Sequence, residues 1–289
     1  MNAQPDAEII QAIAIELAVD PSFVEKDWHA MRVVGAIVDQ THEGMRLVFS
    51  GGTSLSKGYG LIQRFSEDLD FKVILPEPEP TRPKRRQYRK KLVERIRTAG
   101  PWNIEDDDIT SGGGFFKCRI GYSPNFSVPS ALRTQIQLEV SFRPPALRVE
   151  ERSLQSFVAH ARQLDPEVQT ISCVAPSETA ADKIAALTWR IPSRRRDDDD
   201  DDPTVVRHLH DLVALEQLAT ENPVFPKLLA KLVRTDAKRD RDGDDGRPPE
   251  QRIANTLKIL ASDPEYPKEY EQFVLSMSYA AEGEAPDFT

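Results

Sequence analysis

The chain has 289 residues, with 38 basic and 47 acidic side chains and a formal net charge of −9. Its 39% hydrophobic and 29% charged residues are typical of a globular protein, and the negative charge argues against indiscriminate nucleic-acid binding. No apolar run reaches the length of a membrane span, and the N-terminus lacks the pattern of a signal peptide, so we expect a cytoplasmic protein with no membrane contact.

The N-terminal segment predicts two helices. Ile9, Ile13 and Leu17 recur at helical spacing, and Pro21 opens a second helix with one apolar stripe that includes Trp28. We interpret these as core positions, and Trp28 as a packing residue rather than a base-stacking one.

A short apolar strand, Leu47 to Phe49, stops at Ser50-Gly51-Gly52, where a sharp turn or a close backbone approach needs residues without a Cβ. After the turn, Leu55, Tyr59 and Ile62 recur at helical spacing. The N–H groups at a helix start have no partner within the helix, so an anion such as a triphosphate can bind there.

The next strand runs from Asp68 to Leu75. Strand side chains alternate between faces, so Asp68 and Asp70 share one face, while Leu69 and Phe71 point to the other. Two neighbouring carboxylates repel each other unless a cation lies between them, and oxygen ligands suit Mg²⁺. Taken separately, the glycine pair is also a common turn, and Asp-Leu-Asp can be a solvated strand face.

Residues 76–83 form a proline-rich linker to a strongly basic helix, which we expect over 84–99. Between residues 81 and 100 there are nine basic residues and one acid, Glu94. This helix is either a solvated surface or a phosphate-binding surface beside the active site. The candidate RNA contacts are Lys84, Arg85, Arg86, Arg89 and Lys90.

A clean alternation from Arg133 to Phe142 predicts another strand, with Glu139 on its polar face. Glu139 is therefore a candidate third carboxylate, and an exposed strand glutamate is the alternative. Cys118 and Cys173 lie far apart without a zinc-binding pattern, so we expect neither a metal site nor a disulfide at them.

From Ser153 onward the sequence looks helical. We expect a helix from Ser177, as its cap, to about Trp189, and another over 204–218 with Val205, Leu209, Leu212 and Val213 facing inward. In the second helix, Asp211 follows Arg207 by four residues, as in an exposed pair.

Between these helices, residues 194–202 (RRRDDDDDD) form a low-complexity run that we expect to be a solvated, mobile loop whose aspartates favour the start of the next helix. Residues 236–249 are a linker, and two amphipathic helices, at about 250–260 and 266–280, follow it.

The motifs together resemble a known family. GGTSLSKG (51–58) followed by RFSEDLDF (64–71) resembles the AbiEii/AbiGii nucleotidyltransferase toxins, including the MenT type, within the DNA polymerase β-like nucleotidyltransferases. FVEKDWH (23–29), ETAADKIAAL (178–187) and HLHDLVAL (208–215) are similar to further motifs of this family. The resemblance extends from Phe23 to about Leu215.

This resemblance implies an α+β fold: a polymerase β-like sheet with flanking helices and a mostly helical C-terminal half. We expect a nucleotidyltransferase core at 1–150 and a helical domain at 151–289 that closes the active-site cleft. The family's motifs imply that Asp68 and Asp70, with Glu139, hold one or two Mg²⁺ ions, and that Lys183 and Asp211 serve the active site. They further imply a triphosphate site formed by Ser50, Gly51, Gly52, Thr53, Ser54, Lys57 and Lys183.

The implied function is that of a toxin from a bacterial toxin–antitoxin or phage-defence system. It would transfer NMP from an NTP to an RNA acceptor, expected to be the tRNA 3′ end, and so block translation, with a cognate antitoxin as partner. Transfer to a protein hydroxyl and a non-catalytic nucleotide-binding module are the alternatives. Ser66 is a candidate for regulatory modification, and the acidic run at 197–202 would repel RNA if it lies near the cleft.

Overall fold

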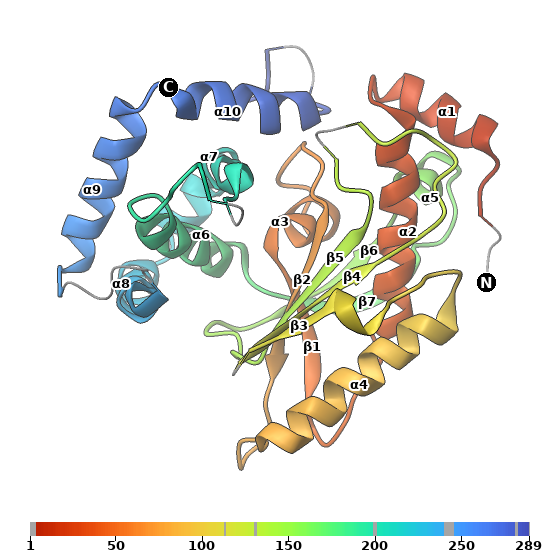
Figure 1. Ribbon diagram of the computed structural model, residues 1–289, viewed down its shortest axis with the longest axis horizontal. Coiled ribbons are helices and arrows are strands. Elements are labelled where there is room, and N and C mark those ends of the chain that lie inside the picture. Colours follow the sequence, from red (N-terminus) through yellow and green to blue (C-terminus); the bar gives the residue numbers. More distant parts are fainter. Residues whose placement is uncertain are drawn as a thin grey trace. The chain divides into compact units, whose positions relative to one another are not determined.

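The computed structural model describes residues 4–112, 114–129, 132–198, 201–239, 246–280 and 283–288 (Figure 1). The chain divides into two compact units. The first comprises Met1–Gly60 and Phe65–Val174, and the second comprises Leu61–Arg64 and Ala175–Thr289. The domain boundary that we expect after residue 150 stays a prediction.

The first unit contains a mixed sheet of seven strands in the order β3-β4-β5-β2-β1-β7-β6. β2 pairs with β5 in parallel and with β1 antiparallel, so the strands that carry the candidate carboxylates are neighbours. Its elements are α1 (Ala7–Glu16), α2 (Pro21–Ile37), β1 (Arg46–Ser50), α3 (Gly51–Thr53), η1 (Ser54–Gly58), β2 (Asp68–Ile74), α4 (Arg82–Ala99), η2 (Asp106–Asp108), β3 (Ile109–Ser111), β4 (Phe115–Ile120), β5 (Ile136–Ser141), β6 (Glu150–Leu154), α5 (Phe157–Ala161) and β7 (Val168–Cys173). The mixed sheet with its helices confirms the α+β fold.

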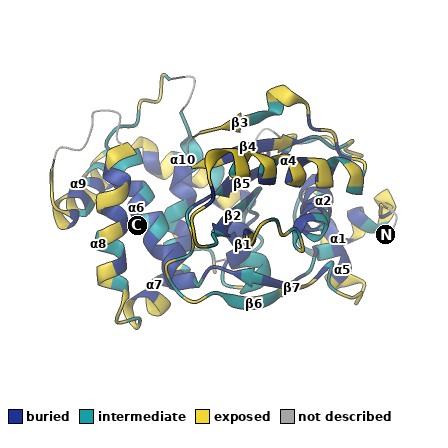
Figure 2. Ribbon diagram, turned by 90° about the horizontal axis from the view of Figure 1, so that it is seen from below, coloured by how far each residue is buried: buried dark blue, intermediate teal, exposed yellow. Residues whose placement is uncertain are grey.

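One face of this sheet is the main core of the unit. Leu69, Phe71 and Val73 of β2 pack in one cluster with Tyr88 and Leu92 of α4, and α2 contributes to the same cluster. The dark-blue inner sides of α2 and α4 in Figure 2 show this burial. Because strand side chains alternate, Asp68 and Asp70 point to the opposite face of the sheet.

Two local expectations in this unit are wrong. The helical turns after β1 cover residues 51–58, earlier than Leu55 to Ile62, because Gly58 ends them and Gly60 follows in the left-handed region at φ +65°. The stretch after Ser153, expected to be helical, contains strands β6 and β7 around the five-residue helix α5. Val168, Ile171 and Cys173 of β7 are buried and belong to the main core cluster.

The second unit is helical. It contains α6 (Pro176–Arg190), η3 (Pro203–Val206), α7 (Arg207–Thr220), α8 (Phe225–Asp236), η4 (Ala237–Arg239), α9 (Pro249–Ser262), α10 (Glu265–Phe273) and η5 (Leu275–Met277). Its apolar cluster joins Leu187 of α6, Leu260 of α9 and Tyr266 and Tyr270 of α10.

Two details of the helix predictions change. Ser177 is not the cap of α6, which begins at Pro176 after Ala175; its hydroxyl instead accepts a hydrogen bond from Asn222. Val213 of α7 is 55% exposed, because the buried side of this helix carries Asp211 and Leu215.

The described part of the 194–202 run is exposed at residues 195–197, but ion pairs hold it at Arg194. Arg194 binds Asp201 (Nε–Oδ1 2.7 Å) and Glu269 of α10 (Nη1–Oε2 2.6 Å). Asp202 accepts a hydrogen bond from the Thr204 N–H, which confirms the expected support for the start of the next helix. Residues 199 and 200 lie outside the described residues, as do 240–245 of the predicted linker.

None of the helices in the described ranges is long and apolar enough to span a membrane. Cys118 and Cys173 are buried free thiols, and burial raises the pKa of Cys118 to about 12 and that of Cys173 to about 11.

Candidate active site

The glycine turn after β1 lies directly against Asp70. Gly51 has φ +73°, a conformation that favours glycine, and a Cβ at this position would be 2.0 Å from Oδ2 of Asp70. In the sheet, Ser50 pairs with Asp70. The absence of a side chain at residue 51 therefore makes room for the carboxylate beside the backbone of the turn.

The candidate carboxylates form a row across the sheet. The parallel pairing of β2 with β5 places Asp70 opposite Glu139 and Asp68 opposite Gln137. Directly paired residues point to the same side of a sheet, about 5 Å apart. The structure thus places Asp68, Asp70 and Glu139 on neighbouring strands, on the face away from the main core.

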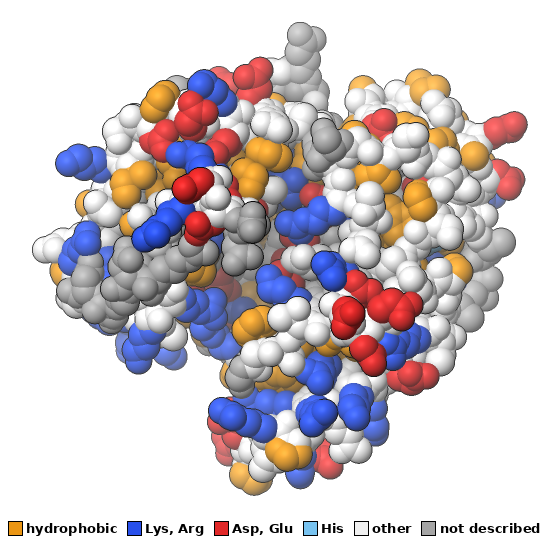
Figure 3. Space-filling view, in the orientation of Figure 1, with side chains coloured by type: hydrophobic (Ala, Val, Ile, Leu, Met, Phe, Trp, Pro, Cys, Tyr) orange, Lys and Arg blue, Asp and Glu red, His pale blue; other side chains and the backbone are white. Residues whose placement is uncertain are grey.

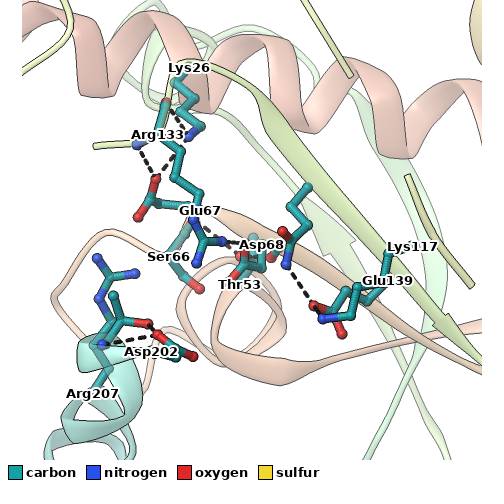
Figure 4. A network of polar contacts seen from close by, with 12 residues as sticks. Lys26, Thr53, Ser66, Glu67, Asp68, Lys117, Arg133, Glu139, Asp202 and Arg207 are labelled. Carbon is teal, nitrogen blue, oxygen red and sulfur yellow. Dashed lines mark hydrogen bonds and ion pairs between the residues drawn. The ribbon is translucent and has the colours of Figure 1, made fainter. Parts of the chain in front are cut away.

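Each end of this group is bound to a basic side chain (Figure 4). Nη1 of Arg133 lies 2.7 Å from Oδ1 of Asp68, and Nζ of Lys117 lies 2.7 Å from Oε1 of Glu139. Gln137 Nε2 also donates to Glu139 at 2.6 Å. These contacts offset the repulsion that neighbouring carboxylates would otherwise have.

The donor chemistry fits a magnesium–nucleotide complex. Among the residues that the structure describes, no three carboxylate, imidazole or thiol side chains are assembled to hold a metal ion. Mg²⁺ bound together with a nucleotide uses one or two protein carboxylates and completes its shell with phosphate oxygens and water. Asp68 and Asp70, on one face of β2, supply this set.

A buried network that the sequence analysis missed holds the start of β2. Lys26 of α2 binds Glu67 at 3.0 Å, and Glu67 also accepts the backbone N–H of Arg133 at 2.7 Å (Figure 4). Burial lowers the pKa of Lys26, and the charge of Glu67 acts in the opposite direction. Lys26 and Glu67 both lie within the recognised motifs, and this position was the available signal.

Thr53 ties the glycine turn to the same strand. Its hydroxyl donates to the backbone oxygen of Asp68 at 2.7 Å, and it lies 3.3 Å from the backbone oxygen of Ser66. Thr53 itself is buried, and Ser66 is partly exposed. The position of the turn relative to Asp68 is therefore fixed by a hydrogen bond as well as by strand pairing.

Two predicted phosphate contacts face the interior instead. Lys57 is nearly buried, with Nζ 2.7 Å from Oδ1 of Asp27 and 3.3 Å from the ring centre of Phe157. Burial lowers the pKa of Lys57 and raises that of Asp27, and their pairing opposes both shifts. The Ser54 hydroxyl is also buried. Lys57 thus binds Asp27 in this structure, and the phosphate-binding roles of Lys57 and Ser54 stay predictions.

The basic helix α4 lies on the other face of the sheet. Its buried residues pack on the apolar side of β2 and β5, so the helix is behind the carboxylates rather than beside them. Lys84 binds Glu43 at 2.9 Å, and Arg85 binds Glu79. Arg82, Arg86, Arg89 and Lys90 have no ion-pair or hydrogen-bond partner within the described residues. Figure 3 shows basic side chains gathered over this helix.

Lys183 and Asp211 meet in the second unit. Nζ of Lys183 lies 2.7 Å from Oδ2 of Asp211 and 3.4 Å from Nδ1 of His208. Arg64 binds both oxygens of the same carboxylate, with Nε–Oδ1 at 2.8 Å and Nη2–Oδ2 at 2.6 Å. Asp211 is therefore not the exposed partner of Arg207 that helical spacing indicates; Arg207 instead donates to the Phe273 carbonyl.

The electrostatics of this cluster keep Asp211 ionised. Burial by itself would raise the pKa of Asp211, but the charges of Arg64 and Lys183 hold that pKa well below its usual range. Burial lowers the pKa of His208, and the charge of Lys183 lowers it further. A neutral His208 follows from this arrangement.

A family model matches most of the chain. The family described as "Nucleotidyl transferase AbiEii toxin, Type IV TA system" matches residues 33–288, which confirms the predicted resemblance. No curated protein matches the sequence.

Among solved structures, the nucleotidyltransferase toxin MenT4 from Mycobacterium tuberculosis H37Rv is 20% identical. The match covers 93% of this chain and 94% of that one, with a TM-score of 0.56, and it supports the fold. A nucleotidyltransferase-like antigenic protein from Paracoccidioides brasiliensis is 14% identical over 81% of this chain and 93% of its own, at a TM-score of 0.38.

Proposed function

We propose a substrate, a metal and an acceptor for this chain, which belongs to the AbiEii nucleotidyl transferase toxin family of type IV toxin–antitoxin systems and is a nucleotidyltransferase. The proposed reaction is Mg²⁺-dependent transfer of NMP from an NTP to an RNA hydroxyl, with the tRNA 3′ end as acceptor and loss of translation as the consequence. The observation that carries it is the row of Asp70 and Glu139 beside Asp68, with Gly51 against Asp70.

In this reaction the oxygen of the acceptor hydroxyl forms a bond to the α-phosphorus, the bond from the α-phosphorus to the bridging oxygen breaks, and pyrophosphate leaves. Asp68 and Asp70 would hold Mg²⁺, with Glu139 as the third carboxylate. Bound Mg²⁺ would acidify the attacking hydroxyl and stabilise the leaving pyrophosphate. Backbone N–H groups of the turn at 50–54 would donate to the phosphates, and the family resemblance adds Lys183 and Asp211.

The basic side chains of α4 that have no partner in the described part of the chain support an RNA acceptor. Arg82, Arg86 and Lys90 recur every fourth residue, so they follow one line of the helix surface, and Arg89 lies beside it. Lys and Arg side chains that bind phosphates make affinity fall as salt rises. Because α4 is behind the carboxylates, it would bind the body of the RNA and not its reacting end.

The position of α4 also favours a second candidate. If the basic helix takes no part, the same carboxylates would transfer NMP to a protein hydroxyl. The non-catalytic module considered for this sequence is set aside, because the family is one of nucleotidyltransferases.

The acceptor is tested with two matched variants. Arg82, Arg86, Arg89 and Lys90 are changed to Gln in one variant, and Lys84, Arg85, Lys91 and Arg95, which have partners in the unit, in the other. Both variants are incubated with total tRNA, protein extract and labelled NTP. We expect the first variant to label less RNA than the second, and we expect the salt dependence of its RNA binding to decrease more. Label in protein from the wild type would select the second candidate.

A type IV family implies a cognate antitoxin, and we propose Ser66 as a site of regulatory modification. Ser66 is partly exposed two residues before Asp68, where a phosphate would add negative charge to the carboxylate face. Mass spectrometry of the toxin co-expressed with its antitoxin would detect the modification, and an unmodified Ser66 would reject the idea.

A further inference from the structure

We propose that strand β4 supports the 3′ end of the RNA acceptor, with Phe115 stacking on one base and Lys117 and Arg119 binding the adjoining phosphates. This inference rests on the proposed RNA transfer. β4 would supply an RNA-binding surface beside the carboxylates, which α4 does not supply because it lies on the other face of the sheet.

The three residues share the carboxylate face of the sheet. They alternate with Phe116, Cys118 and Ile120, which are buried in the main core. Phe115 is 43% exposed, and the side chains of Lys117 and Arg119 are 44% and 55% exposed. β4 therefore presents an aromatic ring and two cations in line, with successive side chains about 7 Å apart.

The register connects this line to the candidate catalytic residues. β4 pairs with β5 so that Lys117 lies opposite Glu139, and β5 pairs with β2 so that Glu139 lies opposite Asp70. Two strand spacings, about 10 Å, separate Lys117 from Asp70 across the sheet. This distance is within reach of one nucleotide, so in the proposed arrangement the nucleotide before the terminal hydroxyl would lie over β4.

The chemistry of the surface matches a single-stranded nucleic acid. Every base has a π face, so stacking on an aromatic side chain beside cations binds single strands with little sequence preference. Phe115 is the only aromatic among the exposed large apolar side chains in the part of the chain that the structure describes. Its neighbour in the pairing is Ser141, so the ring is a single aromatic in polar surroundings rather than an apolar patch for a protein.

The ring is also held in place. A Cβ at Gly112 would be 2.5 Å from Cε1 of Phe115, so the ring packs on the backbone of this glycine. Arg119 already contacts Asp108 (Nε–Oδ1 3.1 Å), and this carboxylate opposes phosphate binding there. Lys117 has three donor hydrogens, and among the described residues its one carboxylate partner is Glu139, which leaves capacity for a phosphate.

The test compares Phe115→Ala, Phe115→Leu and Phe115→Trp with Ile15→Ala, which removes an exposed apolar side chain of α1 in the same unit. The KM values for total tRNA and for the NTP are measured separately. We expect Phe115→Ala to raise the KM for tRNA about 5- to 150-fold, which is the loss of one stacked base, with the KM for NTP unchanged. Trp should retain the wild-type value, Leu should not, and Ile15→Ala should have no effect.

A second variant tests the phosphate contact. Arg119→Gln should reduce the salt slope of tRNA affinity by about one. If the wild type labels RNA but Phe115→Ala or Phe115→Leu keeps the wild-type KM for tRNA, the proposed stacking on Phe115 is wrong, while the proposed transfer to RNA is unaffected. A KM raised for the NTP alone would place the nucleotide base at Phe115 and overturn the proposal, and wild-type protein that labels no RNA would contradict the proposed function itself.

Discussion

Replacing Gly51 with Ala tests the close contact between the glycine turn and Asp70. The new Cβ would be 2.0 Å from Oδ2, 2.7 Å from Cγ and 2.8 Å from Cβ of Asp70. Since contacts under 3.0 Å are essentially never found, the carboxylate must move by about 1 Å or the turn must shift. A displacement of about 1 Å in a reacting group costs on the order of 10²-fold in rate.

The same substitution also has a backbone cost, which a matched control isolates. At φ +73° an alanine costs about 1 kcal/mol relative to glycine. Gly60 has φ +65° and no heavy atom within 4 Å of its would-be Cβ, so Gly60→Ala carries the backbone cost without the clash. Gly60→Ala should lose about 1 kcal/mol of unfolding free energy, and Gly51→Ala should lose more because it adds the clash with Asp70.

The assay measures transfer of label from an NTP under saturating Mg²⁺, together with urea unfolding of each variant. We expect Gly51→Ala to lose about 10²-fold in kcat, while Gly60→Ala stays close to wild type. Equal activity of the two variants would refute the conclusion that residue 51 must lack a side chain to position Asp70.

Two further predictions concern buried charges. Arg64→Met leaves the Asp211 carboxylate with Lys183 as its remaining close cation, so we expect a loss of about 3–5 kcal/mol in urea unfolding; a loss under about 1 kcal/mol would contradict the structural role of the pair. Burial, aided by the charge of Arg32, lowers the pKa of His29 to about 4. Between pH 6.5 and 4 the unfolded chain therefore binds more protons than the folded chain, and the folded state loses stability as the pH decreases. We expect about 2 kcal/mol less stability at pH 5 than at pH 7, and an equal slope in His29→Gln would exclude this cause.

Local sequence patterns were sufficient for the centre of the fold. The alternation in β2 separated Asp68 and Asp70 from the core positions, and the alternation in β5 placed Glu139 on its polar face. Glycine at residue 51 indicated a close backbone approach, which the contact with Asp70 confirms. These features depend on neighbours in the chain, and strand periodicity describes such neighbours well.

Long-range pairing explains the contacts that local patterns did not show. Lys57 lies in a glycine-rich motif that predicts a phosphate contact, and its partner in the structure, Asp27, is 30 residues earlier on α2. Asp211 looked exposed because its partner Arg64 is 147 residues away. Helical spacing describes one element at a time, so it does not indicate which charges meet when elements pack.

The location of the basic helix was missed for a related reason. Its charge bias was evident, but the face of the sheet that α4 covers depends on Tyr88 and Leu92 packing against the apolar side of β2. Charge counts do not contain this information. The exposure of the Phe115 ring was equally hard to predict. Alternation separates the two faces of a strand near the edge of a sheet, but it does not show which face is exposed to solvent.

In the proposed reaction, Asp68 and Asp70 carry a metal-dependent nucleotide transfer. The most direct measurement incubates the purified protein with Mg²⁺, each labelled NTP in turn, total tRNA and protein extract. Asp68→Asn/Asp70→Asn is compared with Asp106→Asn, which changes a carboxylate whose side chain is 94% exposed. We predict label in RNA from the wild type and Asp106→Asn, and none from the double variant or after chelation of Mg²⁺. Undiminished labelling by the double variant would contradict the claim.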